Sequence, residues 1–267
     1  MIVIKIGGAE GIGLEAVCND AAELVHAGER VVLVHGGSHE TNTLAEQLGH
    51  PAQFVTSPSG HTSRRTDRRT MEIFQMACCG RINKRVVQML QARGVNAVGL
   101  SGMDGGLWRG KRKKAIRIVE DGRTSVLRDD YTGTVDQVNA AMLNRLLNIG
   151  LTPVLTPPGL SEEHEPINVD ADRAGAKTAG AMRADTFVIL SNVPGLLRSF
   201  PDEGSLIPEL ARAELDAAIE LAQGRMKKKV LAAGEALDMG VGRVILADAR
   251  AERPIQRALS GEGTVVS

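Results

Sequence analysis

A lysine followed at once by glycines ends the first apolar stretch of the chain, residues 1–6, in the sequence Lys5-Ile6-Gly7-Gly8. A lysine in such a stretch either extends its amine to the surface or is held at a strand end for an anion. Gly7 and Gly8 favour an anion, because residues without a Cβ let backbone N–H groups approach a phosphate closely. We interpret the stretch as a buried strand that ends in a phosphate loop, although short glycine motifs also occur by chance.

A second glycine loop, His35-Gly36-Gly37-Ser38, follows the apolar residues 30–34 and precedes a helical pattern at residues 40–48. Residues 15–27 also carry apolar side chains at helical spacing, so strand, glycine pair and helix occur twice in succession. Two such units imply a parallel sheet with both loops at the carboxyl ends of strands, where ligands bind in open α/β sheets. His35 could be a general base there, but a structural hydrogen-bonding role is favoured.

Four arginines, Arg64, Arg65, Arg68 and Arg69, surround the start of a long helix that the pattern predicts over residues 67–93. Cations at a helix start oppose its dipole, which makes their presence unusual. They form a solvated surface, or at least one of them clamps a carboxylate with its planar fork.

A second basic stretch covers residues 109–117, where six of nine positions are basic. Next to it, residues 116–119 and 124–127 around Asp121-Gly122 indicate a β-hairpin with a type I′ turn. A basic run is usually a solvated surface. On a projecting hairpin of a protein with 32 basic and 32 acidic residues, it also suits an acidic partner.

Two acids, Asp170 and Asp172, open an Ala- and Gly-rich helix that is predicted to end near residue 181. Capping explains both, and one of them could instead hold lysines in place. The remaining pattern predicts strands at 96–100, 152–156, 186–190 and 243–247, helices at 136–147, 210–222 and 224–237, and an edge strand at 263–266.

The bulk composition limits the function classes. The 267 residues suffice for one large α/β domain or two lobes. Balanced charge and 2% aromatic residues disfavour nucleic acid, and no run of about 20 apolar residues or signal peptide is recognisable, so we expect a cytoplasmic protein. Cys18, Cys78 and Cys79 have neither disulfide nor metal-site spacing, and no role is assigned to them.

Other nucleotide and hydrolase motifs fit poorly. Residues 11–16 satisfy a loose dinucleotide pattern, but the strand before them ends too early. Residues 105–111 satisfy G-x-x-x-x-G-K, yet Arg112 replaces the hydroxyl residue that would bind Mg²⁺. Ser191 lies in no G-x-S-x-G elbow, so a serine hydrolase is not supported.

Several short pieces occur in the order of one known family. They are Lys5-x-Gly7-Gly8, His35-Gly36-Gly37, Arg64-x-Thr66-Asp67, Gly99-Leu100-Ser101-Gly102, Asn168-x-x-x-Asp172, Ser191-Asn192-Val193-x-Gly195 and Met226-x-x-Lys229. With these pieces nearly the whole chain resembles the amino acid kinase superfamily, most closely the acylphosphate-forming branch that includes N-acetylglutamate kinase.

This resemblance implies an open, mainly parallel α/β sheet sandwiched by helices, in two lobes. Residues 1–167 would bind the acceptor, with a basic hairpin lid at about 107–128, and residues 168–267 would bind the nucleotide. The implied reaction transfers a phosphoryl group from ATP to a side-chain carboxylate, with Mg²⁺ held mainly by the nucleotide phosphates.

The resemblance also implies roles for single residues. Lys5 and Lys229 would neutralise the transferring phosphoryl group, and Asp172 would hold both lysines. Arg64, Asn168, Gly36 and Gly37 would bind the acceptor. The phosphates and the nucleotide would lie against Gly7, Gly8, Ser191, Asn192, Val193, Gly195, Leu196 and Gly224.

Some residues depart from the acetylglutamate enzymes: Asn192 replaces an aspartate, Ser38 a glycine and Met103 a frequent lysine. With Thr156-Pro157-Pro158, residues 225–229 and the basic stretch, they are similar to kinases of this branch that act on 2-aminoadipate linked to a small acidic amino-group carrier protein, LysW. Carrier docking is expected at Arg109, Lys111, Arg112, Lys113, Lys114 and Arg117.

The expected assembly is a homodimer, by resemblance alone. Two alternatives remain open: free N-acetylglutamate or carrier-linked glutamate as the acceptor, and a catalytically silent nucleotide- or amino-acid-sensing module. Retention of both lysines and the aspartate speaks against silence.

Overall fold

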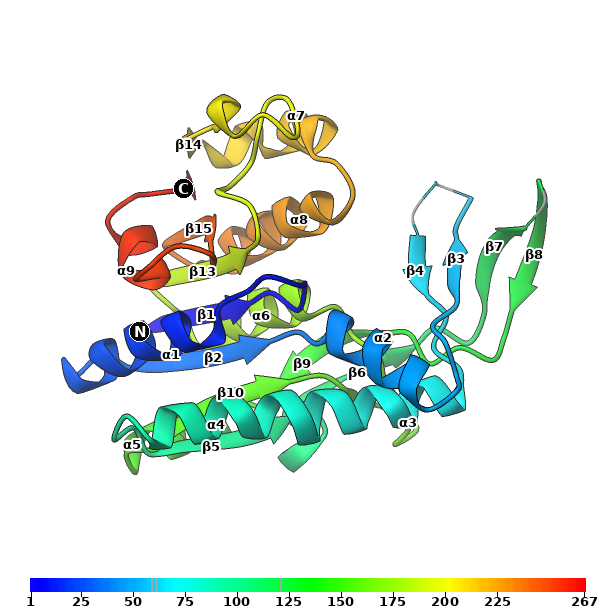
Figure 1. Cartoon of the computed structure of the whole chain (residues 1–267), viewed down its shortest axis with the longest axis horizontal. Helices are drawn as coiled ribbons and strands as arrows, with labels where there is room; N and C mark the ends of the chain where they lie inside the picture. Colours follow the sequence, from blue (N-terminus) through cyan, green and yellow to red (C-terminus); the bar gives the residue numbers. More distant parts are fainter. Residues whose placement is uncertain (59, 61, 121) are drawn as a thin grey trace.

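In the computed structural model, which describes residues 1–58, 60, 62–120 and 122–267, eight strands form a central sheet in the order β14-β16-β15-β13-β1-β2-β10-β5 (Figure 1). The pairing is parallel from β5 through to β15, whereas β16 runs antiparallel to β15. These strands are β1 (Ile2–Ile6), β2 (Val31–His35), β5 (Ala97–Ser101), β10 (Thr152–Thr156), β13 (Thr186–Ser191), β14 (Glu209–Leu210), β15 (Arg243–Asp248) and β16 (Thr264–Val266). The predicted mainly parallel sheet is confirmed.

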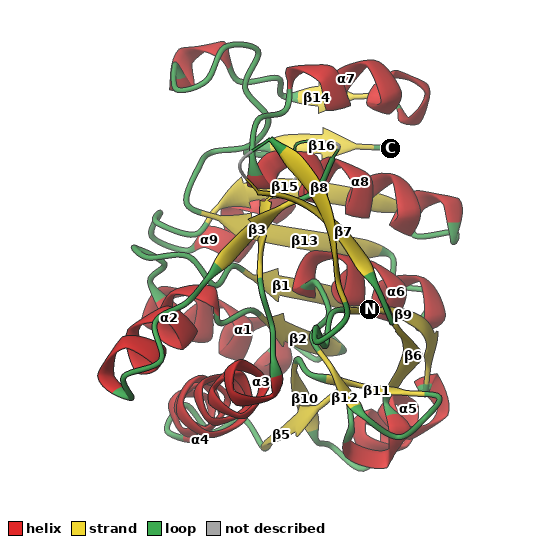
Figure 2. Ribbon diagram, turned by 90° about the vertical axis from the view of Figure 1, so that its right-hand side faces the viewer, coloured by secondary structure: helices red, strands yellow, loops and turns green. Residues whose placement is uncertain are grey.

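Helices cover both faces of this sheet, which Figure 2 shows along the other axis. Side chains alternate along β1, so that Ile2, Ile4 and Ile6 enter one core and Val3 enters the other. The isoleucine face packs against α1 (Leu14–His26), α4 (Asn83–Gln91) and α9 (Pro254–Leu259). The opposite face packs against α5 (Ala140–Asn148), α6 (Ala171–Ala181), α7 (Leu215–Leu221) and α8 (Arg225–Asp238).

The long helix predicted over residues 67–93 is confirmed, with one irregular turn. It consists of α3 (Arg68–Gln75), a π-helical segment η1 (Met76–Ile82) and α4. Asp67 caps its start by accepting a hydrogen bond from Thr70 N. Segments of π-helix often mark functional sites, and this one packs beside α2 (Ser38–Gln47), the helix that follows the second glycine loop.

Two small sheets adjoin the carboxyl ends of the central strands, and the second of them projects from the body of the molecule (Figure 1). The first has the order β12-β11-β6-β9 and the second β4-β3-β7-β8. Their strands are β6 (Trp108–Arg112), β9 (Gly133–Val138), β11 (Gly159–Ser161), β12 (Pro166–Ile167), β3 (Phe54–Thr56), β4 (Thr62–Arg64), β7 (Ile116–Glu120) and β8 (Arg123–Leu127).

The hairpin of β7 and β8 is confirmed, although Asp121 of the predicted type I′ turn lies outside the described residues. Other predictions were wrong. Residues 136–138 are strand rather than helix, because Asn139 caps α5 by accepting a hydrogen bond from Met142 N at 3.1 Å. Residue 210 belongs to β14, and the helix expected from there is α7 with a short 3₁₀ turn, η4 (Arg212–Glu214), before it. Two further 3₁₀ turns are η2 (Asp104–Gly106) and η3 (Glu203–Ser205).

Candidate functional site

Two lysines and one aspartate from three separate elements meet at the carboxyl end of the central sheet. Lys5 Nζ on β1 lies 2.6 Å from Asp172 Oδ1 on the first turn of α6. Lys229 Nζ on α8 donates to the same carboxylate, at 3.2 Å from Oδ1 and 3.0 Å from Oδ2. The three side chains are only 5%, 9% and 10% exposed, in the order Lys5, Asp172, Lys229. Charged side chains are rarely buried unless they are paired, so three of them together mark a candidate functional site.

The start of α6 is what places Asp172. Asp170 caps this helix, its Oδ1 accepting hydrogen bonds from the backbone N–H groups of Asp172 and Arg173. Lys228 Nζ lies 3.4 Å from the other oxygen of Asp170 and so ties the start of α8 to that of α6. Gly175 allows α6 to lie close to β13, because a Cβ there would meet Phe187 Cζ at 2.9 Å. Capping therefore explains Asp170, as the sequence suggested, and lysine pairing explains Asp172.

The charges of this triad are unequal. Burial alone would raise the pKa of the Asp172 carboxyl, but Lys229 and Lys5 outweigh it and hold that pKa well below its usual range. Burial lowers the pKa of the Lys5 amine, with Asp172 opposing and Lys229 adding to the effect. Two cations share one carboxylate, and a further anion at the lysines would complete the balance.

The two glycine loops touch each other beside the triad. A Cβ on Gly8 would collide with the backbone of Gly36 and Gly37, so only glycine fits here. Ser38 Oγ and His39 N both donate to Gly8 O at 2.9 Å. Because α2 begins at Ser38, directly after Gly37, the loops lie at the positive end of a helix. The arrangement suits an anion such as phosphate.

His35 is structural, as favoured from the sequence. Its ring is fully buried, and burial lowers its pKa to about 4. Asn83 Nδ2 is 3.2 Å from Nε2 and also 2.9 Å from Val154 O, while Nδ1 is 2.9 Å from Gly36 O. The amide can donate to Nε2, which leaves the ring proton on Nδ1 to bond the Gly36 carbonyl. A neutral His35 thus fixes the second glycine loop.

Arg64 and Asn168 lie on either side of one hydrogen-bonded network. Arg64 donates from Nη2 to Ser38 O at 2.8 Å and from Nε to Asn42 Oδ1 at 3.1 Å. Asn168 Nδ2 donates to Thr66 Oγ1 at 2.9 Å, and Thr66 N donates to the buried carboxylate of Asp130 at 2.8 Å. Both residues are half-buried, with polar atoms held by neutral partners. The sequence interpretation missed Asp130.

The basic stretch does not lie on the hairpin, and this expectation was wrong for Arg109, Lys111 and Arg112. They belong to β6, which pairs with β9 and β11, because Trp108 and Gly110 turn inward and Trp108 Nε1 donates to Thr178 Oγ1. Among the six residues expected to dock a carrier, Arg117 is on the hairpin; Lys113 and Lys114 lie in the connection before it.

Much of the positive charge of this stretch is already paired. Arg112 donates from Nη1 to both oxygens of Glu165, at 2.9 and 3.1 Å, and from Nε to Asp130 O at 2.9 Å. Its guanidinium also lies 3.9 Å from the ring centroid of Tyr131. Lys114 Nζ is 3.0 Å from Glu163 and Lys111 Nζ 4.0 Å from Glu162. Lys113 and Arg117 are exposed, and the structure records no ion pair for either within the described residues.

The residues expected on the nucleotide side lie around the end of β13 and the start of α8. Gly195 packs so closely against Thr264 and Leu206 that a Cβ would clash, and Leu196 N donates to Thr264 Oγ1 at 2.9 Å. Ser191 Oγ donates to Val193 O at 3.3 Å. Asn192 follows Ser191 directly and is exposed. Gly224 has φ +52° and caps α8, a conformation that favours glycine.

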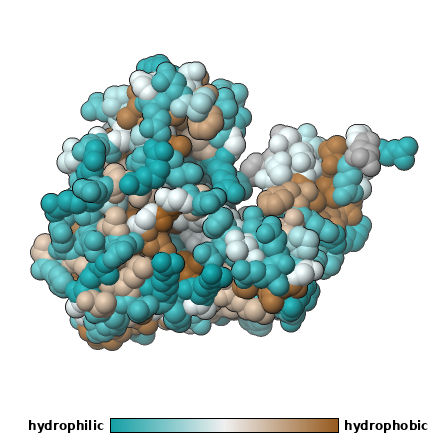
Figure 3. Space-filling view, in the orientation of Figure 1, coloured by the Kyte–Doolittle hydropathy of each residue, from teal (hydrophilic) through white to brown (hydrophobic). Residues whose placement is uncertain are grey.

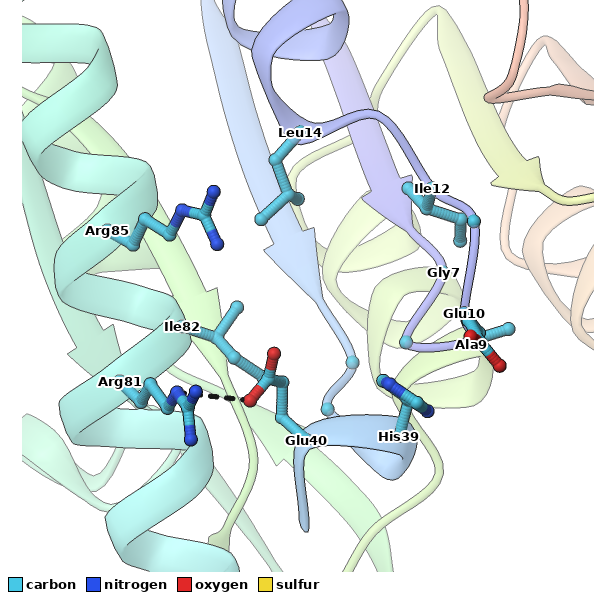
Figure 4. Close-up of a pocket in the computed structure, with 14 residues that line it drawn as sticks. Gly7, Ala9, Glu10, Ile12, Leu14, His39, Glu40, Arg81, Ile82 and Arg85 are labelled. Carbon is cyan, nitrogen blue, oxygen red and sulfur yellow. Dashed lines mark ion pairs between the residues drawn. The ribbon is translucent and has the colours of Figure 1, made fainter. Parts of the chain in front are cut away.

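A pocket of about 240 Å³ reaches the glycine loops from the α4 side (Figure 4). The two lysines do not line it, since both pair with Asp172 on α6. Its wall includes the ion pair of Arg81 Nε with Glu40 Oε2 at 3.1 Å and, one helical turn further on, Arg85. The sequence interpretation missed these residues. The sequence does contain a pattern that could have indicated them, because the two arginines are four residues apart on one predicted helix.

The described residues offer no ready metal centre. Among them, no three His, Cys, Asp or Glu side chains gather where they could hold a metal ion. Both oxygens of Asp172 are occupied by lysines, so this carboxylate does not suit Mg²⁺. Within the same residues, none of the helices has the length and apolar character needed to cross a membrane.

Comparison with known proteins places these features in context. The sequence profile of the amino acid kinase family matches residues 1–248. The chain is 59% identical over 267 residues to a LysW-aminoadipate kinase of Deinococcus radiodurans, covering 100% of this chain and 91% of that protein. It is 58% identical over 268 residues to a LysW-aminoadipate kinase of Thermus thermophilus, covering 100% of both. The structure of N-acetylglutamate synthase from Neisseria gonorrhoeae matches with a TM-score of 0.80 and 26% identity, covering 100% of this chain and 59% of that one.

Proposed function

The chain belongs to the amino acid kinase family, and from this premise we propose that it uses ATP to phosphorylate the side-chain carboxylate of 2-aminoadipate linked to the acidic carrier protein LysW. The product is an acyl phosphate, formed in lysine biosynthesis. One observation carries the proposal: Lys5 and Lys229 converge on Asp172 at the phosphate loops. The two relatives at 59% and 58% identity, both LysW-aminoadipate kinases, support this acceptor.

Charge stabilisation and alignment account for the reaction. A side-chain carboxylate with a pKa of about 4.3 is ionised at neutral pH, so no general base is required. An acceptor oxygen forms a bond to the γ-phosphorus as the bond from that phosphorus to the β,γ-bridging oxygen breaks, and ADP leaves with the electron pair. Lys5 and Lys229 neutralise charge on the transferring group, and Asp172 holds both amines in position.

We propose the remaining roles as the family resemblance implies them. Arg64 and Asn168 bind the acceptor with the backbone N–H of Gly37, whereas the N–H expected from Gly36 already donates to Ile6 O at 3.0 Å. The nucleotide lies mainly against the other half of the molecule, with its phosphates at the first glycine loop. Its proposed contacts are Gly7, Gly8, Ser191, Asn192, Val193, Gly195, Leu196 and Gly224. Mg²⁺ would be held mainly by the nucleotide phosphates, where it would supply charge neutralisation.

We extend the proposal to the whole molecule. Residues 1–167 form the acceptor lobe and residues 168–267 the nucleotide lobe, and the hairpin of β7 and β8 serves as the lid. The protein acts in the cytoplasm as a homodimer. The carrier docks on the part of the basic stretch that is free of internal ion pairs, chiefly Lys113 and Arg117.

Trapping of the acyl phosphate tests the proposed function. The purified protein is incubated with Mg-ATP, hydroxylamine and one acceptor at a time: carrier-linked 2-aminoadipate, carrier-linked glutamate or free N-acetylglutamate. We expect hydroxamate mainly with carrier-linked 2-aminoadipate. If hydroxamate forms only with N-acetylglutamate, the acceptor is the free amino acid derivative and not a carrier-linked one. No hydroxamate with any acceptor would favour the sensing module.

A further inference from the structure

Arg225 lies one helical turn before Lys229 on the same side of α8. Residues four apart on a helix are neighbours on one face, so a side chain at position 225 shares the face that carries Lys229 toward Asp172. Lys227, two positions after Arg225, belongs to a different face. Arg225 also directly follows Gly224, where the chain turns into the helix. Arg225 therefore stands at the edge of the site, on the exposed first turn of the helix that carries Lys229.

The positive charge of Arg225 also acts on Arg64. Burial lowers the pKa of the Arg64 guanidinium, and the positive charge of Arg225 acts in the same direction. Arg64 is the last residue of β4 and Arg225 the first of α8, so the two arginines stand at the ends of elements from opposite halves of the chain. In Figure 1 the start of α8 faces the projecting strands β3 and β4, and Figure 3 shows a notch between that sheet and the main body.

Neither arginine has an acidic partner in the part of the chain that the structure describes. The hydrogen bonds of Arg64 go to the neutral groups Ser38 O and Asn42 Oδ1, which leaves Nη1 available. Arg225 is exposed, and the ion pairs of the basic residues at the start of its helix are made by Lys228 and Lys229 instead. Two cations that face the same notch without a counter-ion would be balanced by an anion between them.

We propose that Arg225 binds the acceptor together with Arg64, the two holding the α-carboxylate of the amino acid between them. The inference rests on the proposed function and adds a specificity residue to it. An acceptor linked through its amino group keeps two carboxylates. The side-chain carboxylate receives the phosphoryl group near the lysine pair, so the α-carboxylate needs cations of its own, and an arginine fork suits it.

Kinetics with each substrate varied in turn test the inference. Arg225→Ala should raise the KM for the acceptor about 10- to 100-fold, as expected for the loss of a charged hydrogen bond, and leave the KM for ATP within about twofold. Lys227→Ala removes the same charge from the same turn but from another face, and should change neither value. Arg225→Lys should restore part of the affinity, because it returns the charge without the fork. Thermal unfolding of each variant checks that it folds.

An altered acceptor identifies the contact. The α-carboxylate of the acceptor is replaced by a carboxamide. This change should weaken acceptor binding to the parent protein strongly and acceptor binding to Arg225→Ala only slightly, because the variant has already lost the contact. Equal losses in both proteins, an equal rise in the KM for ATP, or the same effect from Lys227→Ala would overturn the role of Arg225 while leaving the kinase intact. Absence of turnover by the parent protein with every acceptor would overturn the proposed function, and this inference with it.

Discussion

Asp172 decides the charge at the centre of the site, because it is the one acid that both buried lysines contact in the described structure. Breaking a buried ion pair leaves an uncompensated charge and costs about 3–5 kcal/mol. The same carboxylate fixes the positions of both amines. Stability and catalysis therefore depend on it together.

Asp172→Asn should lower the free energy of unfolding by about 3 kcal/mol and reduce kcat at least about 100-fold. Urea unfolding and hydroxamate formation measure the two effects. Asp170→Asn is the matched control, because asparagine caps a helix as well as aspartate and the contact with Lys228 is half-exposed. A stable Asp172→Asn protein would show that the lysines do not need this carboxylate.

His35 gives the protein an acid-sensitive stability. Its pKa is about 4 in the folded state, against 6.5 for an ordinary histidine. Between these pH values the unfolded chain takes up a proton that the folded protein does not, so stability falls as the pH falls from about 6.5 to about 4. The loss reaches about 3 kcal/mol at most.

Unfolding by urea at several pH values between 7.5 and 4.5 checks this prediction. His35→Asn should show a shallower loss across that window, since asparagine does not titrate and can still donate to Gly36 O. Asp172 titrates only at lower pH, so it does not mask the comparison. Parallel curves for the two proteins would mean that His35 is not responsible.

For single residues, the sequence predicted which side chains form the triad of Lys5, Asp172 and Lys229, but not the partners of other side chains. Lys5, Asp172 and Lys229 were found because each belongs to a short motif. The pairing of Arg112 with Glu165 was not, because 53 residues separate them and nothing local indicates their contact. The sequence predicted that Arg112 docks a carrier, whereas in the structure it contacts the segment of Asp130 and Tyr131.

Among the elements, the π-helical segment η1 supports the second glycine loop. A Cβ on Gly37 would lie 2.5 Å from Cys78 Sγ and 2.8 Å from Ile82 Cδ1, both in this segment. Cys78 is fully buried, and burial raises the pKa of its thiol to about 12, so it acts as a packing residue. The irregular turn thus fits against the loop.

Gly37→Ala should therefore destabilise the protein by about 1–3 kcal/mol, as overpacking does, and lower kcat by displacing the loop. Adding Cys78→Ala removes the sulfur and should recover part of both losses, with Ile82 still in contact. Gly80→Ala is the control within η1, because a Cβ there meets nothing within 4 Å. If Gly37→Ala and Gly80→Ala behave alike, the loop does not depend on this packing.

Long apolar strands and helices were predictable because each has several residues of consistent period. The strands β3, β4, β11 and β12 contain only two or three residues each and were missed for lack of a period. They assemble the two small sheets through distant pairings, such as Thr56 with Val119 and Leu160 with Arg109. The projecting part of the molecule was therefore the least predictable.

At the scale of the whole molecule, a neutral protein must attract an acidic carrier through a local surface. Ion pairs with Glu163 and Glu165 neutralise part of the basic stretch. Lys113 and Arg117 remain exposed, and β8 adds Arg123, which the sequence interpretation left out. Beside them the projecting sheet also exposes Phe54 and Val126, at 53% and 52%, where Figure 3 shows a hydrophobic surface.

Reversing Lys113 and Arg117 to glutamate should raise the KM for the carrier-linked acceptor and flatten its dependence on salt, because screening acts on charges that attract the carrier. The KM for ATP and turnover of a free N-acetylated amino acid should not change. Reversing Arg145 and Arg183 instead alters the net charge equally on exposed positions outside the projecting sheets. If carrier affinity falls equally in both double variants, the effect is due to overall charge. If the Lys113 and Arg117 variant keeps its carrier affinity at low salt, this surface does not take part in docking.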